Sequence, residues 1–67
     1  MPRYIITIHL DGGGSATLTE DAQNPGLIEA LISQQLRQTD PRFRLQFPRS
    51  VIDVEKAKVV GWSIDEG

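Results

Sequence analysis

The sequence predicts a small α+β domain of two layers in the order ββαββ, an antiparallel sheet of about four strands with one helix packed on one face. The first observation behind this prediction is a segment, residues 24–36, whose apolar residues recur at helical spacing. The second is the alternation of apolar and polar residues on either side of it, which is typical of half-buried strands. At 67 residues, the chain has the length of a single small domain, residues 1–67.

The predicted helix begins after Asn24, whose side-chain oxygen can accept a backbone N–H of the first turn. Pro25 then occupies the first helical position, where its missing N–H costs nothing. The apolar residues of the segment fall on one stripe and the polar residues fall outside it. We expect this stripe, with Leu31 at its centre, to pack on the sheet: Leu27, Ile28, Leu31, Ile32 and Leu36.

Two strands are predicted before the helix, in residues 3–10 and 16–19. The apolar Ile5 on the more polar face of the first strand indicates that this strand is central. The glycine-rich residues 11–15 between the two strands predict a hairpin loop. A phosphate-binding loop is the alternative. Such a loop leads into a helix and has a lysine nearby, whereas residues 11–15 lead into a strand and have no lysine nearby.

Residues 42–47 after the helix alternate most regularly, with Phe43, Leu45 and Phe47 on the inner face. Residues 51–54 fit either a short strand or a turn. Residues 56–64 are predicted to form the last strand, and apolar residues on both of its faces indicate a central strand or one that faces a partner. One face would carry Val60, Trp62 and Ile64, and the other Ala57, Val59, Gly61 and Ser63.

The composition excludes several classes of protein. There is no cysteine and only one histidine, so neither a disulfide nor a Cys/His zinc site can form, and we expect no cofactor. The net charge of −2 does not favour binding to nucleic acid by bulk charge. No segment approaches the roughly 20 apolar residues of a membrane span, and the N-terminus does not resemble a signal peptide. We therefore expect a cytoplasmic protein that does not enter a membrane.

No catalytic constellation is evident. His9 could act as a general base, but no nucleophile accompanies it, and a half-exposed position on a strand explains it better. Asp53 and Glu55 would share a strand face and could bind a cation, but Lys56 and Lys58 nearby indicate solvated charges instead. We expect that the protein is not an enzyme.

Four arginines form the most basic stretch of the chain, and their planar guanidinium groups suit phosphates and carboxylates. They predict a surface for nucleic acid or an acidic partner, with an ordinary solvated strand face as the other explanation. Phe43 and Phe47 fall on the core face, so they cannot stack on bases as the aromatic residues of single-strand binders do. The arginines are Arg37, Arg42, Arg44 and Arg49.

These observations favour a small non-enzymatic protein-interaction module that self-associates. One helix covers only one face of a sheet, and an uncovered apolar face usually marks an interface. The expected occupant is a second copy, which would form a homodimer, or another protein. A nucleic-acid-binding accessory or regulatory protein is the alternative. The face predicted for self-association carries Ile5, Thr7, Ala57, Val59, Gly61 and Ser63.

Overall fold

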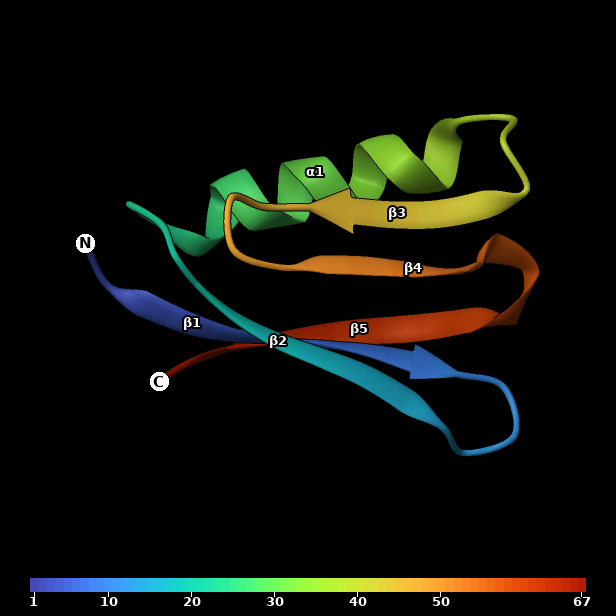
Figure 1. Ribbon diagram of the computed structural model, residues 1–67, viewed down its shortest axis with the longest axis horizontal. Helices are drawn as coiled ribbons and strands as arrows, with labels where there is room; N and C mark the ends of the chain where they lie inside the picture. Colours follow the sequence, from blue (N-terminus) through green and yellow to red (C-terminus); the bar gives the residue numbers. More distant parts are fainter.

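Five strands, one α-helix and a short 3₁₀ helix make up the chain in the computed structural model, which describes residues 1–67 (Figure 1). The predicted α+β class and the order ββαββ are confirmed. A fifth strand arises because residues 51–54 form a strand of their own. The elements are β1 (Arg3–Leu10), β2 (Ser15–Asp21), α1 (Pro25–Arg37), β3 (Arg42–Gln46), β4 (Val51–Glu55), η1 (Lys56–Lys58) and β5 (Val59–Glu66).

The first sheet contains three antiparallel strands in the order β2-β1-β5. β1 is central, as predicted, and it forms the predicted hairpin with β2. The hairpin loop contains Gly12 and Gly13, both with φ +88°, a left-handed backbone that favours glycine. β5 pairs with β1 alone, so a central position does not explain its apolar residues on both faces.

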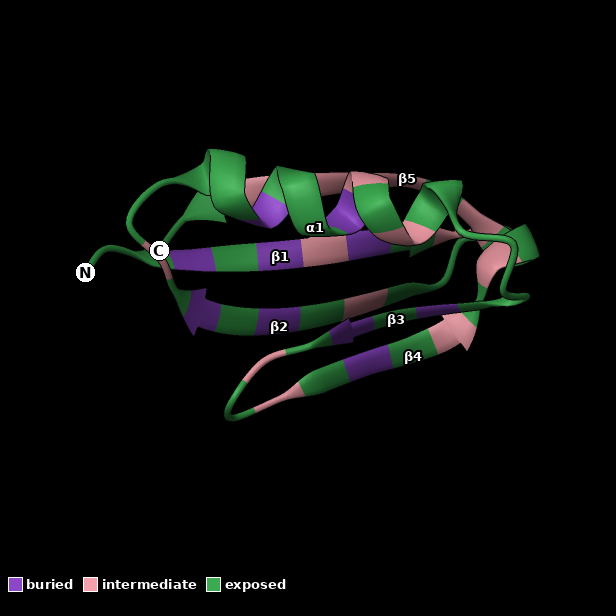
Figure 2. Cartoon of the chain, turned by 90° about the horizontal axis from the view of Figure 1, so that it is seen from above, coloured by how far each residue is buried: buried purple, intermediate pink, exposed green.

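The second sheet contains β3 and β4, which are antiparallel and form a hairpin closed by a turn in residues 47–50. β4 lies beside β2, and β3 lies nearest to α1. Seen from above, α1 runs over β1, with β5 on one side and β2, β3 and β4 on the other (Figure 2). The five strands therefore curl around one side of the helix in two hydrogen-bonded groups.

The helix α1 has the predicted N-terminus, where the Leu27 N–H donates to Asn24 Oδ1 at 3.3 Å and Pro25 occupies the first turn. Its buried stripe is narrower than predicted, because only Ile28 and Ile32 face the sheet fully. The prediction that Leu31 packs into the sheet layer is wrong. The strands curl around one side of α1 only, and Leu31 lies beside that contact with 42% of its surface exposed. Leu27 and Leu36 are also exposed, at 51% and 39%.

The last predicted strand is irregular. Lys56–Lys58 form the 3₁₀ helix η1, and the pairing of β1 with β5 then shifts by one residue. His9 lies opposite Gly61, whereas Leu10 lies opposite Val59, so Val60 is the extra residue of a β-bulge.

Nine buried residues from both sheets and the helix form one core between them. Trp62 and Phe47 are partly buried and pack against this core, as predicted. No helix in the structure has the length and apolar character needed to cross a membrane. The core residues are Tyr4, Ile6, Ile8, Leu18, Ile28, Ile32, Phe43, Leu45 and Ile52.

Candidate interaction surfaces

The outer face of the first sheet is the surface predicted for self-association. β1 contributes Ile5 and Thr7, and the register places Thr7 opposite Ser63 of β5 on one side and Thr17 of β2 on the other. The hydroxyl groups of Thr17 and Thr7 lie 3.5 Å apart. Gly61 lies on the same face of β5, opposite His9. Four of the six predicted residues are therefore brought together: Ile5, Thr7, Gly61 and Ser63.

The other two predicted residues of this face lie elsewhere. The bulge reverses the direction of the side chains that precede it, so Val59 packs against the core beside Leu10. Val60 was predicted to share a face with Trp62 and Ile64, but these two residues pack against the core whereas Val60 is 66% exposed. Ala57 is in η1 and belongs to no strand. The alternation of apolar residues does not reveal this bulge, because Val59 and Val60 are both valine and either of them could face the core.

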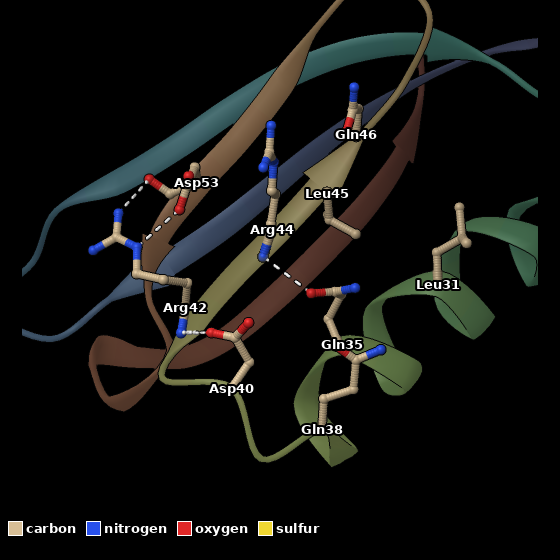
Figure 3. A pocket seen from close by; sticks show the side chains of 9 residues that line it. All are labelled: Leu31, Gln35, Gln38, Asp40, Arg42, Arg44, Leu45, Gln46 and Asp53. Carbon is tan, nitrogen blue, oxygen red and sulfur yellow. Dashed lines mark hydrogen bonds and ion pairs between the residues drawn. The ribbon is translucent and has the colours of Figure 1, made fainter.

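A groove between α1 and β3 is a surface that the sequence did not indicate (Figure 3). It has a volume of about 420 Å³ and is lined by Leu31 and Gln35 of the helix and by Arg44 and Leu45 of β3. The helical spacing of Leu31 and the other apolar residues was visible in the sequence, but their exposure was not. What could not be seen is that β3 is the last strand of its sheet and runs along this side of α1.

The backbone of β3 is held at this groove by side chains. The Arg44 N–H donates to Gln35 Oε1 at 3.2 Å, and the Arg42 N–H donates to Asp40 Oδ1 at 2.8 Å (Figure 3). In a wider sheet, the carbonyl groups of a neighbouring strand would accept the hydrogen bonds of these two backbone N–H groups. The groove therefore contains an unpaired strand edge.

The arginines do not form one patch. Arg42 is paired with Asp53, through Nε to Oδ1 at 2.9 Å and through Nη2 to the Asp53 carbonyl at 3.2 Å. Arg44 lies two residues further along the same face and makes no ion pair. Arg37 is at the C-terminal end of α1, and Arg49, in the turn after β3, lines a separate hollow with Arg3, Thr19, Glu20 and Asp21.

The candidate chemical residues are separated from one another. His9 is exposed on the outer face of the first sheet, between Ser15 and Gly61. Asp53 accepts from Arg42, and Glu55 lies 3.9 Å from Lys58 in an exposed pair. No group of three or more histidine or acidic side chains is arranged to hold a metal ion.

No known protein family, curated protein or solved structure matches this chain. The surfaces of the chain itself are therefore the guide to its function.

Proposed function

We propose that this chain is a small non-enzymatic protein-interaction module that self-associates through the outer face of the sheet β2-β1-β5. The observation that carries the proposal is that α1 covers the inner face of this sheet while no element covers the outer face (Figure 1). Short uncharged side chains, those of Thr7 and Ser63, lie at its centre. Ile5 and Val60 add exposed apolar surface, at 37% and 66% of their full exposure.

The physical chemistry of a second copy on this face is favourable. A domain of this size buries a smaller fraction of its surface than a larger protein and is marginally stable alone. A two-fold axis through the face would let the same residues serve both subunits. Two sheets with short side chains on their facing surfaces can approach closely, at a spacing of roughly 10 Å. Self-association would therefore bury Ile5 and Val60 in both copies.

The charged residues of this face lie at one end of it. One competing explanation for a monomer is that the arginine-bearing strand covers it, but Arg42 and Arg44 belong to the second sheet. Asp65 lies opposite Ile5, and Arg3 and Asp21 form an ion pair of 3.4 Å two residues further along the same face. The centre of the face is therefore free of charge.

Nucleic-acid binding is the alternative, and the placement of the arginines supports it less well. Binding of this kind needs a positive patch that is not interrupted by acidic groups. Asp53 and Glu55 lie directly opposite Arg44 and Arg42 on the neighbouring strand. The four arginines also lie at three separate places on the molecule, which favours the interaction module.

Sedimentation equilibrium over a wide concentration range tests the proposal. We expect the average mass to rise from 7.4 kDa toward about twice that value as the concentration increases. A single species of 7.4 kDa at the highest concentration would contradict self-association.

A further inference from the structure

The free edge of β3 exposes a regular row of backbone groups. On the side facing β4, the Phe47 N–H donates to the Ser50 carbonyl at 2.8 Å and the Lys56 N–H donates to the Pro41 carbonyl at 2.9 Å. Because backbone groups alternate in direction along a strand, the N–H and C=O groups of Arg42 and Arg44 point the other way. No strand lies on that side, since β3 ends its sheet.

The N–H groups of Arg42 and Arg44 at this edge are capped by side chains rather than paired with a strand. Gln35 and Asp40 supply one side-chain oxygen each, at 3.2 Å and 2.8 Å. Both caps are in exposed hydrogen bonds, so a backbone carbonyl could replace them without leaving a buried polar group unsatisfied. Unpaired edges of this kind are templates for another strand.

On the side of the helix, the groove is lined by Leu31 and by two glutamines, Gln35 and Gln38 (Figure 3). Leu31 is 42% exposed, and Leu27, which lies outside the lining of the groove, is 51% exposed one turn earlier on the same stripe. A strand added to β3 would point every second side chain to the core side of the sheet, toward this part of α1. Apolar side chains at those positions would cover both leucines.

The charge at the edge identifies the chemistry of the occupant. Arg42 is paired with Asp53 at 2.9 Å, whereas Arg44 makes no ion pair and projects from the outer face. An acidic residue directly across from Arg44 in an added strand would be favourable. A second copy paired symmetrically about Arg44 would instead place two arginines opposite each other, which is destabilising. The charges therefore favour a different chain.

We propose that the free edge of β3 binds an extended segment of another protein by strand addition, with an acidic residue opposite Arg44 and apolar residues on either side of it. The bound segment displaces the Gln35 cap and bonds to the backbone of Arg44, while its apolar residues contact Leu27 and Leu31. This interaction goes beyond the self-association proposed above, because it uses a different sheet and a partner of different sequence.

Titration of the full chain with short fluorescent peptides tests this inference. The probe has the central sequence Val-Glu-Val, the charge control has Val-Lys-Val, and a third peptide has Val-Glu-Val with the backbone N-methylated at the glutamate. We expect the first to bind roughly tenfold more tightly than the second, from the opposite-charge and like-charge pairs across the edge. The third should bind no better than background, because strand addition needs its backbone N–H.

Reversal of the charge at position 44 supplies the matched comparison for the peptide titration. Arg44→Glu should reverse the preference so that Val-Lys-Val binds more tightly, whereas Arg37→Glu, at the end of α1, should leave it unchanged. In amide NMR spectra, the probe should shift the signals of Arg44 and of the Gln35 side chain.

Three results would overturn the inference. They are no shift of these signals up to millimolar peptide, equal binding of the N-methylated peptide, and concentration-dependent shifts at β3 without peptide, which would show a second copy at the edge. Sedimentation of the chain alone, compared with that of Val60→Lys on the other sheet, tests self-association without peptide, so the two proposals can fail separately.

Discussion

The Ser50 hydroxyl donates a hydrogen bond of 2.9 Å to Glu20 Oε1, and this contact joins the two sheets. Glu20 is the last buried residue of β2, with 8% of its surface exposed, and Ser50 lies in the turn between β3 and β4. The two sheets share no backbone ladder, so this bond adds a polar link between the two hairpins to the core contacts that they share.

Loss of this bond should destabilise the fold. Ser50→Ala leaves a part-buried carboxylate oxygen without its donor, and we expect a loss of about 1–2 kcal/mol in the free energy of unfolding. Urea denaturation measures it, with Ser15→Ala at the exposed start of β2 as the control. Equal stability of the two variants would show that the contact does not hold the sheets together.

The two faces of the helix should differ in their response to truncation. Ile32 is fully buried, so Ile32→Ala should cost about 2–5 kcal/mol. Leu31, the adjacent residue, is 42% exposed, and Leu31→Ala should cost about 1 kcal/mol or less. Thermal and urea unfolding of both variants compares them directly. A greater loss for Leu31→Ala would mean that the helix is rotated relative to the structure described above.

The hairpin loop should tolerate alanine at one glycine but not at its neighbour. Gly13 has φ +88°, so Gly13→Ala should cost about 1–2 kcal/mol through backbone strain. Gly14 has no positive φ, and a Cβ there would meet only the Leu10 Cβ at 3.9 Å, an ordinary contact. Gly14→Ala should therefore be close to neutral. Equal effects on the melting temperature would contradict the loop conformation.

The arginines should give little salt-dependent binding to nucleic acid. If they did bind phosphates, removing Arg42 and Arg44 together would lower the log–log slope of affinity against salt by roughly one unit per lost contact. We expect fluorescence anisotropy at low salt to show no such binding for the wild-type chain, because Asp53 already pairs with Arg42. Tight binding that weakens with salt and with the double substitution would favour the alternative function.

The fold was predictable because local patterns agree with it. Asn24 and Pro25 mark the helix start, and the alternation in residues 3–10 and 42–47 assigns Ile6, Ile8 and Phe43 to the core, where all of them lie. These patterns depend on neighbours along the chain, which a single sequence records.

The parts that escaped prediction depend on contacts between distant segments. The bulge that turns Val59 inward arises where β5 must pair with β1 beyond His9. The exposure of Leu31 depends on how far the strands curl around α1. The groove exists because β3 is an edge strand beside the helix, and strand order cannot be read from alternation.

The central claim, that the outer face of the first sheet mediates self-association, is tested most directly by one pair of lysine substitutions. Val60→Lys places a charge on that face, and an unpaired charge buried at an interface costs several kcal/mol. Val51→Lys is the matched control, because Val51 is 52% exposed on the second sheet.

Sedimentation equilibrium of both variants should be measured at a concentration where the wild-type chain is dimeric. We predict that Val60→Lys has the monomer mass of 7.4 kDa while Val51→Lys keeps the dimer mass. A dimer that survives Val60→Lys, or one that is lost with Val51→Lys instead, would contradict the account.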